Sequence, residues 1–311
     1  MNSAKLVLIL TIGVFGILNT EMGFMGLLPL IAQEYGISVA QAGLTVSLFA
    51  LGIGISAPIM PLLLSGVNRK TMMLLVLGVF LVGNIVSIFT TDFNVLLAAR
   101  VIPAIFHPIY CSLAFAVAAA SASVAPEDAP KAVSKVFIGV SAGMVLGVPV
   151  SSYLASTFSL PIAMSFFGIV NLITFLATIF MVPSMPVTER KSYGEQLSVL
   201  KKPVLWISMI GVILMNASIF GVFSYASDYL NNVSNMSWTV ISLVLFVYGL
   251  ANIPGSVIGG NLLSKMPLKT AVAYPIVLGL LYVIMATLGT NPIMMAAIIL
   301  VWGVLGGIGA N

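Results

Sequence analysis

Long apolar stretches separated by short polar segments dominate the chain and predict ten membrane-spanning helices. Each stretch is near or above the ~20 residues that an α-helix needs to cross the hydrocarbon core of a bilayer. The first stretch is too long for the apolar part of a signal peptide, so we interpret it as an uncleaved helix. The predicted spans are 5–32, 38–64, 71–91, 94–120, 132–157, 160–182, 204–229, 238–263, 268–289 and 292–310. The pattern predicts an all-α polytopic membrane protein.

The composition supports this fold class and narrows the chemistry. Of the 311 residues, 60% are hydrophobic and only 6% are charged, whereas about a quarter of the residues in a soluble domain carry charge. A single cysteine, Cys111, excludes a disulfide framework within the chain, and neither a metal nor a cofactor is expected. The net charge of +4 would suggest a nucleic-acid partner in a soluble protein, but the placement of the charges indicates otherwise.

The basic residues lie in alternate loops and orient the chain in the membrane. The loops around Tyr35, Asp92, Phe158, Asn232 and Asn291 contain no Lys or Arg. By the positive-inside rule, the N-terminus and the long segment after span 6 are cytoplasmic. The excess of positive charge is therefore a topology signal, and no nucleic-acid partner is expected. The basic loops contain Lys5, Arg69, Lys70, Lys131, Lys135, Arg190, Lys191, Lys201, Lys202, Lys265 and Lys269.

Two similar segments indicate an internal repeat. "LLSGVNRKT" (63–71) and "LLSKMPLKT" (262–270) share Leu, Leu, Ser, Lys and Thr at an offset of 199 residues, and the same offset maps Lys5 onto Val204, where span 7 begins. Parallel repeats are a known transporter architecture, with the binding site at their interface. We predict a six-helix bundle in residues 1–182, a cytoplasmic linker in 183–203 and a partial, four-helix bundle in 204–311.

The second bundle lacks the counterparts of spans 5 and 6. By the repeat offset these would lie at about 330–381, whereas the sequence ends at Asn311. Truncation of a longer chain is the favoured explanation, and a ten-helix variant is the alternative. A third possibility is a transport-inactive fragment, or a half-complete bundle that needs a partner.

Three ionisable residues lie well inside the spans of the first half, namely Glu21, Arg100 and His107. A charge near the bilayer centre costs roughly 2.5–3.5 kcal/mol, so such residues face a bundle interior or a wet cavity. At 1.5 Å per residue, Glu21 lies about 16 Å, Arg100 about 10 Å and His107 about 20 Å below the outer membrane boundary. Arg100 and His107 are two turns apart on one helix face. The three side chains therefore occupy overlapping layers.

Three stretches carry a resemblance to a known family: "NTEMGFMGLLPLIAQEYGIS" (19–38), "RVIPAIFHPIYCSLAFAVAAASASVAPED" (100–128) and "VFIGVSAGMVLGVPVSSYLA" (136–155). They resemble the major facilitator superfamily, specifically its bacterial drug/sugar efflux branch, which includes the arabinose-efflux-permease-like proteins. The resemblance covers essentially the whole chain. It implies a monomer in the bacterial inner membrane, with two six-helix bundles around a central cavity. Such proteins export small molecules by alternating access, usually against inward proton flow.

In the resembled fold the first and fourth helices line the cavity together, which implies that Glu21, Arg100 and His107 form the proton-coupling site. One carboxylate that moves between two environments can bind a proton outside and release it inside. Simpler interpretations remain open at this point. Glu21 and Arg100 could form a static pair that fastens two helices, His107 could be a packed neutral side chain that donates to a backbone carbonyl, and Arg100 could extend to the outer interface.

Further residues are candidates for binding and packing. Asn19, Asn216 and Tyr225 are expected to line the substrate cavity, although interhelical hydrogen bonding by the amides and an interfacial position of the tyrosine are the simpler explanations. The glycines Gly139, Gly143 and Gly147 have the small-xxx-small spacing of close helix packing, and Pro149 adds to the bend that the resemblance implies for this helix.

Arg69, Lys70 and Lys265 match the basic positions of the family's cytoplasmic loop motif. The acidic partners are missing: the first copy lacks its Asp, and Ser264 stands where an acid is common.

The leading functional hypothesis is a proton-coupled exporter of drug-like or sugar-like small molecules. Proton-coupled import would use the same residues. An intramembrane enzyme is not favoured, because the chain has no H-E-x-x-H motif and no second histidine. The expected partners are a small-molecule substrate, protons and the lipid bilayer.

Overall fold

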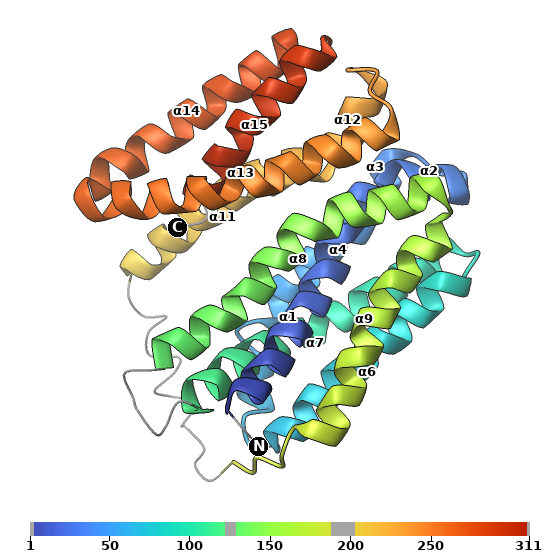
Figure 1. Cartoon of the computed structure of the whole chain (residues 1–311), viewed down its shortest axis with the longest axis vertical. Coiled ribbons are helices and arrows are strands. Elements are labelled where there is room, and N and C mark those ends of the chain that lie inside the picture. Colours follow the sequence, from blue (N-terminus) through green and yellow to red (C-terminus); the bar gives the residue numbers. More distant parts are fainter. Residues whose placement is uncertain (1–2, 122–128, 188–202, 310–311) are drawn as a thin grey trace.

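The computed structural model describes residues 3–121, 129–187 and 203–309, and every regular element in these ranges is helical. Figure 1 shows the helices as a bundle of long, roughly aligned rods. The elements of the first half are α1 (Ser3–Gly23), η1 (Phe24–Leu27), α2 (Leu28–Tyr35), α3 (Val39–Ala42), α4 (Leu44–Ser56), α5 (Met60–Leu63), α6 (Arg69–Phe89), α7 (Phe93–Ser121), α8 (Ala129–Thr157) and α9 (Leu160–Met181). Those of the second half are α11 (Pro203–Ser224), α12 (Ala226–Asn232), α13 (Trp238–Lys265), α14 (Pro267–Leu288) and α15 (Pro292–Gly309).

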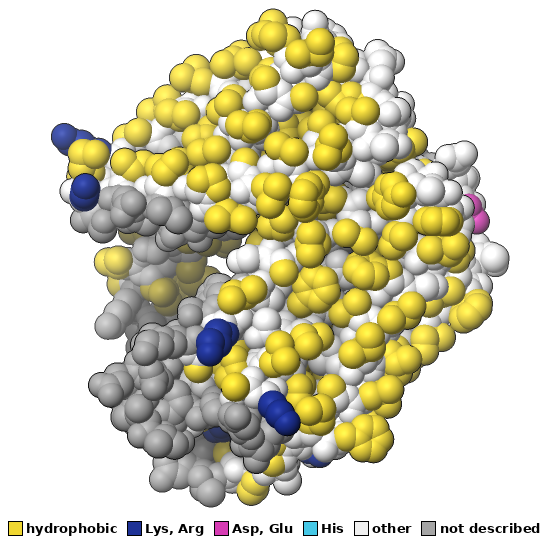
Figure 2. Space-filling model, in the orientation of Figure 1, with side chains coloured by type: hydrophobic (Ala, Val, Ile, Leu, Met, Phe, Trp, Pro, Cys, Tyr) yellow, Lys and Arg dark blue, Asp and Glu magenta, His cyan; other side chains and the backbone are white. Residues whose placement is uncertain are grey.

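The ten predicted spans are confirmed. Ten helical segments of the described chain are long and apolar enough to cross a membrane, from Ala4–Tyr35 to Pro292–Gly309. Lys and Arg side chains gather toward one end of the molecule, whereas the acidic side chain in view lies at the opposite end (Figure 2). This distribution is the one that the positive-inside rule predicts for the cytoplasmic end. The residues Arg190, Lys191, Lys201 and Lys202, and most of the predicted linker, lie outside the described residues.

Several spans are interrupted, which the sequence pattern did not predict. The first span passes from α1 through the 3-10 turn η1 into α2, and the seventh passes from α11 into α12 at Tyr225. The repeat offset of 199 maps Phe24–Leu27 onto residues 223–226, so the two breaks occupy equivalent positions. Irregular backbone at membrane depth is tolerated where protein groups satisfy it. Here α8 does so: the Ser151 hydroxyl donates to the Gly23 carbonyl at 2.8 Å, and the Ser152 hydroxyl to the Gly26 carbonyl at 3.1 Å.

Helix α8 packs directly against α1 through its glycines. A Cβ atom on Gly139 would overlap the carbonyl oxygen of Thr11, and one on Gly143 would lie 2.7 Å from the Cβ of Leu18. Gly147 approaches the Cβ of Met22, with 3.2 Å left for an added Cβ. These three glycines thus lie where α8 comes close to α1, and the broken first span is held against α8 along most of its length.

Helix α8 also joins the two groups of helices. A Cβ on Gly249 of α13 would lie 2.8 Å from the Cγ1 of Val145, so α13 approaches α8 closely. A second contact lies near the membrane end, where the Tyr225 hydroxyl sits against Gly43 between α3 and α4. Figure 1 shows α12 close to α2 and α3 at this end.

Helix α11 differs from its repeat counterpart α1 in its surroundings. Helix α1 is largely buried by α7, α8 and α9, whereas α11 exposes large apolar side chains along most of its length, including Val204 at 72% and Ile207 at 71%. A Cβ added to Gly211 or to Gly221 would meet no atom of the described residues within 4 Å. The second group of helices is thus packed on fewer sides than the first.

Candidate functional site

The ionisable cluster, which we define as Glu21, Arg100 and His107, lies inside the first group of helices. The carboxylate oxygen Oε2 of Glu21 on α1 lies 3.1 Å from Nε2 of His107 on α7. This is ion-pair distance, although the angles do not meet those of a hydrogen bond, and Nδ1 of His107 has no partner among the described residues either. The Glu21 side chain is only 17% exposed and the His107 side chain only 10%. An acid and a base from two different helices therefore meet in a largely water-excluded place.

Arg100 lies one layer further out and is not paired with a carboxylate in the described part of the chain. Its guanidinium is sandwiched between two phenylalanine rings, with Cζ 3.8 Å from the centroid of Phe24 and 4.2 Å from that of Phe49. Nη1 donates to the carbonyl oxygen of Thr20 at 3.1 Å, whereas Nε and Nη2 have no hydrogen-bond partner among the described residues. Arg100 is 2% exposed. It neither extends to the interface nor forms the static pair with Glu21.

Phenylalanines from three helices enclose the cluster. The rings of Phe49 on α4 and Phe80 on α6 lie 6.1 and 6.2 Å from the imidazole of His107 and 6.4 Å from each other. These rings exclude water from the imidazole on two sides, and a low-dielectric surrounding strengthens the attraction between Glu21 and a charged His107. Sequence analysis missed Phe24, Phe49 and Phe80, because an aromatic residue in an apolar span carries no distinguishing signal. Only the position of Phe24, one turn after Glu21, could have suggested it.

The arrangement supports proton binding. A carboxylate and an imidazole 3.1 Å apart can hold one proton between them, and either group can carry it. A packed neutral histidine that donates to a backbone carbonyl is not what the structure contains, since neither ring nitrogen has a backbone partner among the described residues. Cys111, one turn beyond His107 on α7, is a free, partly buried thiol.

The three predicted cavity residues do not come together. Asn19 is fully buried, and neither atom of its amide has a hydrogen-bond partner among the described residues. Asn216 lies exposed on α11, where its amide donates to the Val212 carbonyl of its own helix at 2.9 Å. Tyr225 is 40% exposed and contacts Gly43 at the membrane end. Their role in substrate binding stays a prediction.

Asn171 on α9 is a buried amide whose side chain makes hydrogen bonds to other residues. The sequence analysis did not select it for the site. It donates to the Thr20 hydroxyl at 2.9 Å and to the Phe167 carbonyl at 3.0 Å. Since the Thr20 carbonyl accepts from Arg100, Asn171 supports the segment of α1 that carries the cluster.

The basic positions of the loop motif lie at helix ends. Lys70 donates to the carbonyl oxygen of Ile179 near the end of α9 at 2.8 Å, and the backbone N–H of Arg69 donates to the Met185 carbonyl at 3.1 Å. Lys265 ends α13 and is exposed. Asn68 caps Lys70 and also donates to the Ser184 hydroxyl at 2.7 Å. The first loop motif thus fastens the start of the segment that leads to the second half.

The described residues contain no cluster of metal-binding side chains, and the one stretch with the spacing of an enzyme motif lies in a different structural context from that motif. No group of three or more His, Cys, Asp or Glu side chains comes together in the part of the chain that the structure describes. Residues 139–143 read Gly-Val-Ser-Ala-Gly, the spacing of a hydrolase nucleophile elbow, but they lie inside the continuous helix α8 rather than at a strand-to-helix turn.

The sequence comparisons identify the family. A family model described as Major Facilitator Superfamily matches residues 10–311, and the chain belongs to this superfamily. Among the similar proteins is an uncharacterized MFS-type transporter, YtbD, of Bacillus subtilis, which is 34% identical over 84% of this chain and 66% of its own length. A probable sugar efflux transporter of Helicobacter acinonychis is 28% identical over 85% of this chain and 67% of its own length. The chain thus spans about two thirds of the length of these relatives.

Solved structures show the same fold. The crystal structure of the nucleoside transporter NupG (D323A mutant) superposes with a TM-score of 0.77, covering 99% of this chain and 80% of that one at 15% identity. The predicted fold class is therefore confirmed. The chain is a multi-pass protein of the bacterial inner membrane and a member of a family of small-molecule transporters, which are not enzymes.

Proposed function

We propose that this protein exports drug-like or sugar-like small molecules by alternating access and that export is coupled to proton antiport through Glu21 and His107. The observation that carries the proposal is the 3.1 Å approach of the Glu21 carboxylate to the His107 imidazole inside the first group of helices. Proton binding at such a pair changes the charge of a largely water-excluded layer. A change of charge there alters the relative stability of states that expose the layer to different degrees.

The surroundings of the pair support a role in coupling rather than in fastening helices. Arg100 is held by two phenylalanine rings and the Thr20 carbonyl, and the ion-pair partner of the Glu21 carboxylate among the described residues is His107. The break at Phe24–Leu27 begins three residues after Glu21. Discontinuous membrane helices form the substrate and coupling-ion sites of many transporters. Efflux as the direction is supported by the similarity to the probable sugar efflux transporter.

The experiment compares Glu21→Gln with the wild type in proteoliposomes. A panel of radiolabelled monosaccharides and one lipophilic dye cation is tested for transport driven by an imposed pH gradient and, separately, for exchange across the membrane without a gradient. We expect Glu21→Gln to lose gradient-driven transport and to retain exchange, because binding and alternation persist while proton coupling is lost. Glu34→Gln is the matched control, since Glu34 lies at the exposed end of the same span.

Retention of gradient-driven transport by Glu21→Gln would refute the coupling role. The sign of the gradient that drives accumulation decides the direction: accumulation against inward proton flow supports export, whereas accumulation with it would establish import.

A further inference from the structure

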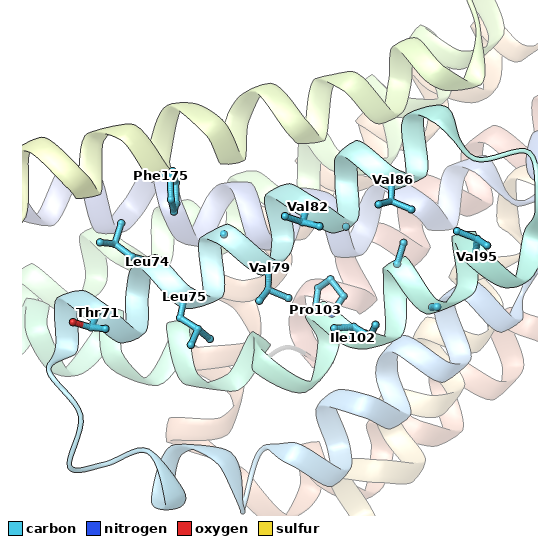
Figure 3. Close-up of a pocket in the computed structure, with 14 residues that line it drawn as sticks. Thr71, Leu74, Leu75, Val79, Val82, Val86, Val95, Ile102, Pro103 and Phe175 are labelled. Atoms are coloured by element: carbon cyan, nitrogen blue, oxygen red, sulfur yellow. The ribbon is translucent and has the colours of Figure 1, made fainter.

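A long apolar groove runs along the outside of the first group of helices, away from the ionisable cluster. It lies between α6 and α7 and has a volume of about 770 Å³. Figure 3 shows side chains of α6 and α7 along it, from Thr71 at one end to Val86 and Val95 at the other, with Phe175 of α9 beside it. Thr71 is the one polar side chain among its lining residues. Its exposed members include Val82 at 61% and Ile102 at 52%, so the groove opens toward the lipid rather than toward the centre of the bundle.

The groove exists because α6 lacks side chains at two positions. A Cβ on Gly83 would lie 2.5 Å from the Ala99 carbonyl oxygen and 2.8 Å from Pro103, so α7 comes close there and forms the floor. Gly78 has free space: an added Cβ would meet only the ring of Phe175, at 3.5 Å. At the equivalent position of the second repeat stands Val277, which carries a branched side chain.

A fixed positive charge lies at the cytoplasmic end of the groove. Lys70 precedes Thr71, and its ammonium donates to the Ile179 carbonyl at 2.8 Å, one helical turn beyond the Phe175 that lines the groove. An ammonium has three donors, and this one uses a single acceptor among the described residues. The cationic end faces the leaflet in which anionic lipids attract basic side chains.

We propose that this groove binds one anionic phospholipid of the cytoplasmic leaflet, with its phosphate at Lys70 and an acyl chain along α6. From Thr71 to Val82 the helix rises about 16 Å, close to the ~15 Å that half of the hydrocarbon core measures. A chain that starts at the phosphate depth of Lys70 therefore fills the groove as far as Val82. The opposite charges of phosphate and ammonium select the lipid headgroup, and the apolar lining accepts the chain. This binding site is separate from the transport function proposed above.

The test is native mass spectrometry of the purified protein with palmitoyl-oleoyl phosphatidylglycerol or palmitoyl-oleoyl phosphatidylcholine added at equal concentration. The wild type is expected to retain one phosphatidylglycerol with about fivefold preference, the effect of about one basic side chain on an anionic lipid. Lys70→Gln is expected to abolish the preference, whereas Lys269→Gln, at the equivalent position of the second repeat, leaves it unchanged.

A second pair of variants tests the acyl-chain part of the groove. Gly78→Leu fills it and is expected to reduce retention of both lipids, while Gly279→Leu, on α14 with no atom within 4 Å of its added Cβ, has no effect. If Gly78→Leu is not monodisperse, Val82→Trp replaces it, because Val82 is exposed. Three results would each overturn the proposal. The wild type could retain the two lipids equally, the variants and their controls could have equal effects, or Val82→Trp could disrupt a protein dimer.

Discussion

Replacing Arg100 with lysine tests the conclusion that this cation is stabilised by aromatic rings rather than by a carboxylate. Lysine keeps the charge and a donor for the Thr20 carbonyl but loses the planar guanidinium, which lies 3.8 Å and 4.2 Å from the centroids of Phe24 and Phe49. A cation–π contact is worth about 0.5–1 kcal/mol at an exposed site and about 2 kcal/mol when it is desolvated. Since a lysine cannot stack on both rings, Arg100→Lys is expected to destabilise the protein by about 2 kcal/mol.

The single cysteine provides the assay. Cys111 is partly buried on α7, so a thiol-reactive fluorophore reports its exposure as the detergent-solubilised protein is heated. A loss of about 2 kcal/mol corresponds to a decrease of about 4–8 °C in the melting temperature. Arg69→Lys, a conservative change at a cytoplasmic helix end, is the control and is expected to change it by less than about 1 °C.

A double-mutant cycle isolates the ring contact. Phe24→Leu alone also removes the contact between the rings of Phe24 and Phe167, whose centroids are 5.7 Å apart, but that loss is the same in both backgrounds and cancels. We expect Phe24→Leu to lower the free energy of unfolding by about 1 kcal/mol less in the Arg100→Lys background than in the wild type. Equal costs in the two backgrounds, or an Arg100→Lys protein as stable as the wild type, would refute the cation–π explanation.

Three further predictions use the packing and the thiol. Gly139→Ala is expected to destabilise the protein by about 1–3 kcal/mol, because its methyl group would overlap the α1 backbone. The control is Gly211→Ala, because no atom of the described residues lies within 4 Å of an added Cβ there. In the same thermal assay this variant should be no less stable than the wild type. Ser151→Ala should cost about 1 kcal/mol, because it removes the 2.8 Å hydrogen bond to the Gly23 carbonyl at the break in the first span. Cys111 should react faster with a membrane-impermeant maleimide in everted than in right-side-out vesicles, because it lies on α7 about 15 Å from the cytoplasmic end and about 27 Å from the outer end; equal rates would contradict this orientation.

The sequence was sufficient for the spans and the topology. Counting residues from the membrane boundary placed Glu21 between Arg100 and His107 in depth, and both lie on α7. Depth could not decide which of them Glu21 approaches. That choice depends on the rotation of α1 against α7, which is set by packing partners such as the glycines of α8 and by the phenylalanines that hold Arg100. Long-range contacts of this kind leave no periodic signal.

The breaks in the spans were missed for a different reason. Hydropathy is continuous through Phe24–Leu27, so the stretch reads as one helix. Gly23, Gly26 and Pro29 were the available signals, since glycine weakens a helix and proline disfavours helical backbone just before it. The donors that stabilise the break, Ser151 and Ser152, lie more than a hundred residues away. Similarly, α11 and α1 have comparable hydropathy, and only the packed structure shows that one is enclosed and the other exposed.

The position of Arg100 between two rings has an electrical consequence. With His107 neutral, the ionisable cluster carries one negative and one positive charge, and arrival of a proton leaves a net charge of one. Because phenylalanine rings and the Thr20 carbonyl hold the guanidinium, Arg100 keeps these contacts when Glu21 is neutralised, and the positive charge stays where it is. A conformational change that moves this charged layer across part of the membrane field does electrical work, up to about 2.3 kcal/mol per 100 mV for a full crossing. The rate of transport should therefore respond to membrane voltage at constant pH.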